Sequence, residues 1–344
     1  MKIIIDKAVP FIERVLEPFA EVVYMDGIAI SAEDVRDADA LIIRTRTKCN
    51  EELLEGSSVK FIATATIGTD HIDMDYCKQK GIYVQNAAGC NAGSVMNYVI
   101  SAIYGSASRK RIRLNGCTVG IIGVGNVGSR VARALQILGF KVLLCDPPRA
   151  QAEGPAQFCD LDFLLRTSDV VTMHVPLNHS TIDMADARFF SKMKLGAIFA
   201  NTCRGEVVVE EDLLHAVPKL GSVIIDTWRN EPRINKDLLA KVDIATPHIA
   251  GYSYQGKMLG TSMSVRSLAR FFNINELYEF FPDPEGVPRD AIKLDLRGKS
   301  EGQIASILQY NYPIFTDDFM FRVDPDRFEE FREHYRYRRE FFID

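Results

Sequence analysis

Residues 117–130 read CTVGIIGVGNVGSR, an apolar run that leads into Gly123, Gly125 and Gly128. The three glycines form the pattern G-x-G-x-x-G, and the residues after them continue as a helical stretch. The first glycine permits a tight turn, the second lets the backbone approach a pyrophosphate, and the third lets a helix pack closely on a strand. A lone motif of this kind is weak evidence. Its position between a strand and a helix predicts a dinucleotide-binding turn.

An acidic residue stands where such a turn requires one. The next apolar run, KVLLCD, ends in Asp146, about 20 residues beyond the last glycine. A carboxylate there accepts hydrogen bonds from a ribose 2′-hydroxyl and repels a 2′-phosphate, so NAD is favoured over NADP. Arg149 lies close behind and leaves NADP open as an alternative.

Apolar runs alternate with helical stretches on both sides of this turn. The first series includes KIIID, the helical stretch VPFIERVLEPFA at 9–20, EVVYM, ADALIIR and VKFIATAT. The second series has six strand candidates, from CTVGIIGVG to VDIATPH, and predicts one complete doubly wound domain. Long helices are expected at 91–111 and 254–273. We therefore expect an α/β fold with parallel sheets.

The last part of the chain has a different composition. The stretch PDPEGVPRD at 282–290 is typical of a linker, and RFEEFREHYRYRREFF at 327–342 is charged and aromatic with helical spacing. We interpret the tail as a small appended module. A solvated terminal helix and an oligomer contact both remain open for it.

Composition excludes several classes of protein. With 344 residues the chain needs two or three domains, and its 47% apolar and 25% charged residues are usual for a globular enzyme. The net charge of -5 argues against nucleic-acid and membrane-surface partners. No run approaches the ~20 apolar residues of a membrane span, and the start MKIIIDKAVPF predicts no secretory signal. The seven cysteines form no CxxC pair, so we expect free thiols, no metal site and a cytoplasmic location.

Three charged residues follow strand candidates of the second series. Arg204 lies in NTCRGE, Glu231 in WRNEPR and His248 in TPHIAGYS. Ligands bind outside the carboxyl ends of the strands in an open α/β sheet. A carboxylate beside an imidazole fixes its tautomer, and an arginine can clamp a substrate carboxylate. The histidine could then take a hydroxyl proton while a hydride leaves the same carbon, which is the chemistry of a hydroxy-acid dehydrogenase. Each residue alone could be structural.

Six stretches together carry a family resemblance. They are GTDHID, VGIIGVGNVGSRVA, HVPLN, NTCRGEVVVEEDLL, DTWRNEP and TPHIAGYS, in this order. Over roughly residues 40–280 the chain resembles the D-isomer-specific 2-hydroxyacid dehydrogenases. The resemblance implies that Arg204, Glu231 and His248 are the catalytic set. It also implies two Rossmann-like lobes, a discontinuous substrate lobe and an active site in the cleft between the lobes.

The resemblance further implies a division into domains and a set of contacts. The expected substrate domain is 1–93 with 254–282, the NAD-binding domain is 94–253, and a C-terminal dimerisation domain is 283–344. The expected substrate is a phosphorylated 2-hydroxy acid, held by Thr45, Thr66 and Tyr252, and the expected assembly is a homodimer. Beyond the three glycines, the expected NAD contacts are Asn126, Val127, Asp146, Val175, Thr202, Cys203, Arg204, Asp226 and Gly251. For Asp226 the alternative is that it merely ends its strand.

A possible phosphate site lies in IIRTRTK. If this stretch continues as a strand, Arg44, Arg46 and Lys48 share one face and Thr45 shares the other with Thr47. We hypothesise that Arg44 or Arg46 helps to hold a substrate phosphate, with a solvated strand end as the alternative.

Two other functions stay open beside the phosphorylated substrate. One is a different 2-hydroxyacid dehydrogenase, acting on 3-phosphoglycerate or on glyoxylate and hydroxypyruvate. The other is a non-catalytic NAD-sensing protein on the same fold. The intact Arg204, Glu231 and His248 set argues against a sensor.

Overall fold

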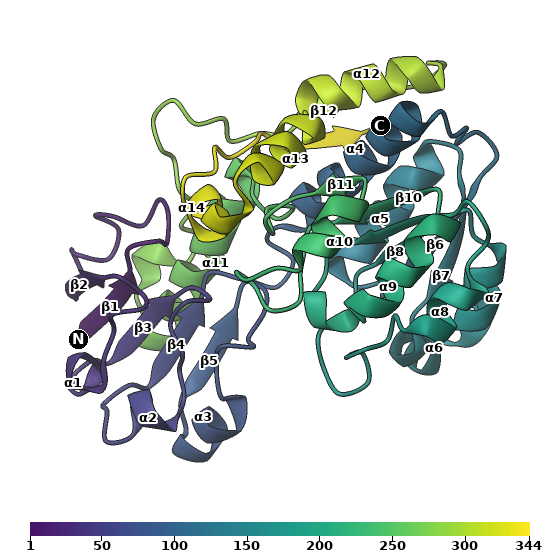
Figure 1. The fold of residues 1–344 in the computed structure, drawn as a ribbon. Coiled ribbons are helices and arrows are strands. Elements are labelled where there is room, and N and C mark those ends of the chain that lie inside the picture. Colours follow the sequence, from purple (N-terminus) through teal and green to yellow (C-terminus); the bar gives the residue numbers. More distant parts are fainter. The chain divides into compact units, whose positions relative to one another are not determined.

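The computed structural model describes residues 1–344 and divides the chain into two compact units. Unit 1 contains Met1–Asn91 and Ser253–Asp290, and unit 2 contains Ala92–Tyr252 and Ala291–Asp344. In each unit, helices pack on a parallel sheet (Figure 1). The predicted α/β fold is therefore confirmed. The predicted domain boundaries, including a separate domain at 283–344, remain predictions.

Unit 1 contains a five-stranded parallel sheet in the order β2-β1-β3-β4-β5. Its strands are β1 (Lys2–Asp6), β2 (Glu21–Met25), β3 (Ala40–Ile43), β4 (Phe61–Thr64) and β5 (Tyr83–Asn86). Its helices are α1 (Ala32–Val35), α2 (Glu51–Leu54), α3 (Met74–Lys80), α11 (Tyr254–Phe272) and the 3₁₀ turn η4 (Asn275–Leu277). The three central strands are apolar on both faces, as expected where helices cover a parallel sheet on both sides.

The helix expected at 9–20 is absent, and that prediction was wrong. These residues form successive turns, with Phe11 at φ 61° and Arg14 at φ 66°, both left-handed. Pro18 lacks the N–H that a helix needs in this stretch. The Glu17 carboxylate accepts the N–H of Arg14 at 2.9 Å, and so satisfies locally a donor that a helix would pair.

Unit 2 contains a six-stranded parallel sheet in the order β11-β10-β9-β8-β6-β7. Each of the six predicted strand candidates supplies one strand: β6 (Thr118–Ile122), β7 (Lys141–Cys145), β8 (Val170–Met173), β9 (Ile198–Asn201), β10 (Ser222–Ile225) and β11 (Ile244–Ala245). The chain runs outward from β6 to β7 and then returns to β8 on the other side of β6. This reversal creates the crevice in which doubly wound proteins bind ligands.

Helices cover both faces of this sheet. On one face lie α4 (Ala92–Lys110) and α5 (Asn126–Ile137). On the other lie α7 (Leu161–Thr167), α8 (Ala187–Lys192), α9 (Glu210–Ala216) and α10 (Lys236–Lys241). The unit also contains α6 (Pro147–Glu153) and three 3₁₀ turns, η1 (Pro155–Gln157), η2 (Gly205–Val207) and η3 (Val217–Lys219).

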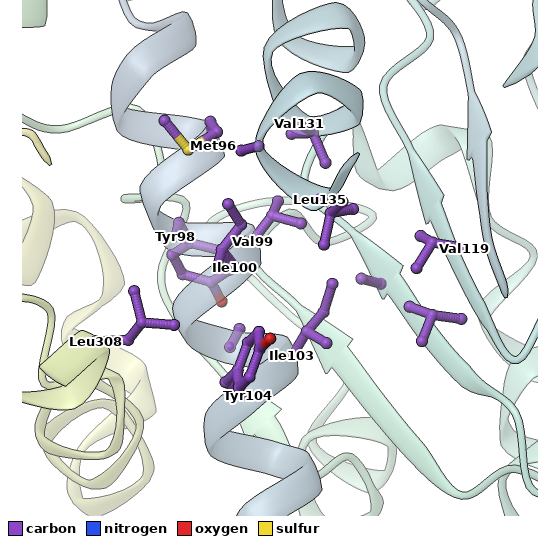
Figure 2. Packing of buried hydrophobic residues seen from close by; sticks show 14 of the residues in the cluster. Met96, Tyr98, Val99, Ile100, Ile103, Tyr104, Val119, Val131, Leu135 and Leu308 are labelled. Carbon is purple, nitrogen blue, oxygen red and sulfur yellow. The ribbon is translucent and has the colours of Figure 1, made fainter. Parts of the chain in front are cut away.

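The helix α4 is the centre of the larger core cluster. Figure 2 shows its Tyr98, Ile100 and Ile103 among side chains of β6, α5 and the C-terminal part of the chain. A helix that is buried nearly all round belongs inside a protein rather than on its surface. Several of its buried hydroxyls are paired: that of Tyr98 lies 2.6 Å from the hydroxyl of Thr246, and that of Ser106 lies 2.6 Å from the hydroxyl of Ser222. None of the helices in the structure is both long and apolar enough for a membrane span.

The C-terminal part of unit 2 shares this core. It contains β12 (Ile292–Leu294), α12 (Glu301–Asn311), α13 (Ile314–Val323), η5 (Pro325–Arg327), α14 (Phe328–Glu333) and β13 (Phe341–Ile343). The helical spacing predicted for 327–342 holds only as far as Glu333. After Glu333 the chain is extended, and the backbone of Phe341 exchanges two hydrogen bonds with the side chain of Asn97 of α4, at 2.7 and 2.9 Å. These bonds and the pairing of β13 with β12 replace the helical ones.

The helix α13 supports the edge strand β11. Asp318 accepts the N–H of Ala245 at 2.7 Å, and Arg322 donates to the carbonyl of Val242 at 2.8 Å. A strand of two residues has little pairing of its own, so Asp318 pairs an N–H that the edge of β11 leaves open, while Arg322 binds the end of α10 just before the strand. The position of β11 matters because the chain continues from it into His248.

Candidate active site

The glycine turn has the geometry that its sequence predicts. Gly123 has a φ of +83°, and a Cβ on it would lie 2.7 Å from the carbonyl oxygen of His174. A Cβ on Gly128 would lie 2.0 Å from the carbonyl oxygen of Gly123. The first and third glycines are therefore required by the protein itself. Gly125 caps the exposed N-terminus of α5 and has open space in front of it, which suits a pyrophosphate at a helix N-terminus.

Asp146 lies at the end of β7, beside the turn. Its carboxylate accepts the N–H of Val124 at 2.8 Å and caps α6 through the N–H of Arg149 at 3.1 Å. The guanidinium of Arg149 is paired with both oxygens of Glu153, at 2.6 and 2.7 Å. The Asp146 carboxylate beside it would repel a 2′-phosphate. The site fits NAD.

The segment after β9 is held by a buried asparagine. Asn201 accepts the N–H of Cys203 at 3.2 Å and donates to the carbonyl of Arg204 at 2.9 Å. A Cβ on Gly205 would lie 1.9 Å from the backbone carbonyl carbon of Trp228, so this segment packs tightly on the one that carries Glu231. Burial raises the pKa of the Cys203 thiol to about 11, which makes it a poor nucleophile.

The segments after β10 and β11 are linked in turn. The Trp228 N–H donates to Glu231 at 2.8 Å, and its indole Nε1 donates to the carbonyl of Thr246 at 2.9 Å. Both partners of Trp228 are thus strand-end residues, and its ring is buried. The indole fixes the distance between Glu231 and the stretch that leads to His248.

Glu231 and His248 meet directly. The Nδ1 of His248 lies 2.8 Å from the Oε2 of Glu231. Burial works to raise the pKa of the Glu231 carboxyl, but the charge of His248 and their hydrogen bond hold it below its ordinary value. Glu231 is therefore an ionised acceptor for an Nδ1–H, and this tautomer leaves Nε2 to exchange a proton with a substrate. The pair has the arrangement of a general acid–base site.

The backbone of His248 is left-handed, with a φ of 56°. Such a conformation costs about 1–3 kcal/mol and persists only where surrounding contacts enforce it. Here the carboxylate of Asp226 accepts the N–H groups of Ile249 at 2.8 Å and Ala250 at 3.0 Å, and the Asp226 carbonyl accepts the N–H of His248 at 2.7 Å. Asp226 is buried, and burial raises its pKa. The prediction that it contacts NAD stays a prediction.

The structure places most of the predicted site residues on unit 2. Arg204, Glu231 and His248 follow β9, β10 and β11, which are neighbours in the sheet. Val175 lies in the turn that follows β8. The backbone nitrogen of Val175 would lie 2.8 Å from a Cβ on Gly123, so the two turns are in close contact. The other predicted contacts of unit 2 lie on the same strand ends or at the start of α5: Asn126, Val127, Thr202, Cys203 and Gly251.

Two predicted substrate contacts, Thr45 and Thr66, belong to unit 1. The hydroxyl of Thr66 lies 2.6 Å from that of Thr64 at the end of β4. The strand β3 ends at Ile43, so the condition under which Arg44, Arg46 and Lys48 would share one face is not met.

A turn replaces the alternating faces after β3. Thr45 and Arg46 are exposed there, and Thr47 is buried. Arg44 donates to the carbonyl of Ala8 at 2.9 Å, and this bond draws the chain out of the sheet.

Sequence reasoning did not place the aromatic residues of the C-terminal part beside Tyr252. The rings of Tyr335 and Tyr337 lie 6.0 and 6.2 Å from the ring of Tyr252. No local pattern could have indicated these contacts, because the partners are far apart in the sequence.

The glycine turn, the acidic residue after β7 and the Glu231–His248 pair define an NAD-dependent dehydrogenase. Residues 96–250 match the family model of the D-isomer specific 2-hydroxyacid dehydrogenase NAD-binding domain. The chain is 45% identical to the erythronate-4-phosphate dehydrogenase of Bacteroides thetaiotaomicron, over 99% of this chain and 97% of that one. It is 40% identical to that of Yersinia enterocolitica, over 99% of this chain and 93% of that one.

Solved structures show the same fold. The NAD⁺-bound 3-phosphoglycerate dehydrogenase of Entamoeba histolytica matches with a TM-score of 0.68 and 27% identity, over 79% of this chain and 96% of that one. The D-lactate dehydrogenase of Aquifex aeolicus, in complex with NAD and lactic acid, matches with a TM-score of 0.67 and 26% identity, over 83% of this chain and all of that one. The chain belongs to the erythronate-4-phosphate dehydrogenases, within the D-isomer-specific 2-hydroxyacid dehydrogenase family.

Proposed function

We propose that the enzyme oxidises 4-phospho-D-erythronate to 2-oxo-3-hydroxy-4-phosphobutanoate, a step in the biosynthesis of pyridoxal 5′-phosphate. Relatives that carry this activity in their names are 40–45% identical over nearly the whole chain. The observation that carries the chemistry is the 2.8 Å contact between Glu231 and His248. Both residues and the glycine turn follow the carboxyl ends of strands in the same parallel sheet.

His248 acts as the base in the proposed reaction. Its Nε2 takes the proton of the substrate C2 hydroxyl, while Glu231 holds Nδ1 and stabilises the imidazolium that forms. NAD, when bound, accepts the hydride from the same carbon. Arg204 binds the substrate carboxylate and polarises the oxygen that becomes the ketone. In the reverse direction the imidazolium returns the proton.

The substrate contacts are part of the proposal. Thr45, Thr66 and Tyr252 offer hydroxyl groups for the sugar-acid chain. Arg46 lies 3.9 Å from Asp26 on an exposed turn, a weak pair that could exchange for a phosphate. Replacing Arg44 or Arg46 with alanine should raise the KM for the phosphorylated substrate. An unchanged KM in both variants would remove these two residues from the proposal.

A homodimer formed through the C-terminal part is also proposed. The side chains of Phe319, Met320 and Val323 are exposed on α13, while its opposite face is buried. Together with residues after α14 they line an apolar surface groove. Exposed apolar patches of this kind mark interfaces.

A cytoplasmic location completes the proposal. All seven cysteines are free in the structure, as expected in a reducing compartment.

The test is NADH formation by the purified full-length protein. 4-Phospho-D-erythronate, D-3-phosphoglycerate and D-lactate should be compared, with a 2-oxo acid added to reoxidise any NADH that stays bound. We expect clear preference for the first substrate. Activity on another substrate alone would keep the mechanism and change the pathway. If NAD binds but no substrate turns over, the sensor alternative replaces the proposal.

A further inference from the structure

Two tyrosines of the C-terminal part pack against Tyr252, a residue of the proposed substrate site. The ring of Tyr252 meets those of Tyr335 and Tyr337 edge to face, at interplanar angles of 68° and 84°. Tyr335 is itself fixed, because its hydroxyl donates to Asp317 at 2.9 Å and accepts from Arg338 at 2.7 Å. Tyr252 therefore rests on a rigid wall rather than on a mobile tail.

Arg332 of α14 lies in the same wall. Its side chain is only 18% exposed, and its guanidinium lies 5.7 Å from the ring centroid of Phe328. Its Nη1 lies 3.3 Å from a carboxylate oxygen of Glu329. The Glu231 carboxylate and a hydrogen bond with the Tyr252 hydroxyl also act to raise the pKa of Arg332. Two of these three partners belong to the proposed site.

The pairing of Arg332 within its own helix is incomplete. Glu329 is half exposed, so its ion pair with Arg332 is screened and contributes little. The buried Nε–H has no hydrogen-bond partner. Leaving such a donor unpaired is destabilising. A buried cation with so little local compensation depends on its interactions with Tyr252 and Glu231.

We infer that Arg332 is a positioning residue of the catalytic site, which holds the Tyr252 hydroxyl in place and stabilises the Glu231 carboxylate that orients His248. This role rests on the proposed function, since Arg332 acts through these three residues. It makes the C-terminal part a component of the active site as well as the proposed dimer contact.

The two parts of this role depend on different properties of Arg332. Stabilising the Glu231 carboxylate requires its positive charge, and holding the Tyr252 hydroxyl requires the shape of its guanidinium group. Glu231 is faced by the ring of His248, the N–H of Trp228 and the charge of Arg332. Removing the arginine charge should make the buried carboxylate easier to protonate, so the acid limb of kcat/KM moves to higher pH. A lysine keeps the charge but loses the planar fork that meets a hydroxyl at a fixed angle.

The experiment compares Arg332→Gln and Arg332→Lys in the full-length enzyme with NAD and 4-phospho-D-erythronate. For Arg332→Gln we expect kcat/KM to fall roughly 10- to 100-fold, with the acid limb moved to higher pH and NAD affinity unchanged. For Arg332→Lys we expect the wild-type acid limb with a raised KM. The matched control is Arg297→Gln, an exposed arginine of the same C-terminal part, which should behave as wild type.

A second pair of variants keeps the test independent of folding. Tyr252→Phe removes only the hydroxyl, and its effect on KM should be smaller in the Arg332→Lys background than in the wild type. Wild-type pH profile and KM in Arg332→Gln, or full additivity of Tyr252→Phe with Arg332→Lys, would overturn the inference. Failure of the proposed function is a separate result, seen as no oxidation by the wild type or as full activity of His248→Asn.

Discussion

His248 shows how a single residue depends on its surroundings. The ring follows Pro247 and precedes Ile249, and only a left-handed turn at this position brings its Nδ1 to Glu231. The carboxylate of Asp226 stabilises that turn by accepting hydrogen bonds from the N–H groups of Ile249 and Ala250. The placement of a titratable ring in an apolar stretch is thus explained by two carboxylates with different tasks. Asp226 shapes the backbone, and Glu231 orients the ring.

Replacing Glu231 with glutamine tests the second task. A neutral amide cannot stabilise an imidazolium, so we expect kcat to fall about 10²-fold or more while NAD affinity is kept. Steady-state kinetics and a fluorescence titration with NAD measure the two quantities. The control is Glu211→Gln, an exposed position in the first turn of α9, which should leave both unchanged. Equal kcat in the Glu231 variant and the wild type would contradict the assigned role.

A second residue-scale prediction concerns His174, whose ring nitrogens face the hydroxyls of Thr172 at 3.0 Å and Thr202 at 3.5 Å. Burial lowers the pKa of His174 from 6.5 to about 3. As the pH falls below 6.5, His174 becomes protonated in the unfolded chain but stays neutral in the folded protein. Stability is therefore lost as the pH falls from 6.5 to about 3. This group contributes up to ~1.4 kcal/mol per pH unit to that slope.

His174→Gln should therefore lose less stability than the wild type across that window. Urea unfolding at a series of pH values gives the slope. His179→Gln, an exposed histidine nearby in the sequence, serves as the control and should keep the wild-type slope. Parallel slopes for wild type and His174→Gln would show that His174 protonates equally in both states.

At the scale of elements, the site is built from turns that follow five neighbouring strands, β6, β8, β9, β10 and β11. Each turn is fixed to the next: Gly123 packs on the turn after β8, Gly205 on Trp228, and Trp228 on Thr246. The edge strand β11 is held from outside by α13, through the hydrogen bond from Ala245 to Asp318. A rigid set of strand ends holds the reacting groups more precisely than long loops would.

Gly205→Ala tests this close contact between turns. The added Cβ would stand 1.9 Å from the Trp228 carbonyl carbon, which is backbone and cannot rotate away. We expect the free energy of unfolding to fall by roughly 1–3 kcal/mol, and kcat to fall because Arg204 and Glu231 move apart. The control is Gly302→Ala on α12, where a Cβ meets nothing within 4 Å. That change should raise stability by about 0.5–1 kcal/mol. Denaturant unfolding measures both, and a Gly205 variant as stable as Gly302→Ala would refute the steric argument.

At the scale of the whole molecule, the C-terminal part has two faces. Its inner face completes the core of unit 2, where Leu308 and Phe341 join the cluster around α4. Its outer face leaves apolar side chains of α13 exposed. An element with one face buried and one apolar face open is suited to join two copies of a chain.

Phe319→Glu should therefore convert the proposed dimer to a monomer. A charge placed in an apolar interface costs several kcal/mol unless it finds a partner, which is enough to separate subunits at micromolar concentration. Light scattering on a gel-filtration column measures the mass. The control is Leu195→Glu, an exposed apolar residue before β9 that does not line the groove. A wild type that runs as a monomer, or a Phe319→Glu protein that stays dimeric, would exclude this face.

The sequence by itself determined the parallel sheet of unit 2 and the glycine turn, and it predicted Arg204, Glu231 and His248 as the catalytic set. These features depend on neighbours in the chain, namely apolar runs, the steric needs of glycine and the placement of residues just after strands. Only the tertiary structure decided that 9–20 forms turns, that the tail leaves its helix at Glu333 and that His248 is left-handed. The role that we infer for Arg332 likewise depends on the tertiary structure. Each of these depends on hydrogen bonds and charges from residues distant in the sequence, which outweigh local preference and leave no local pattern.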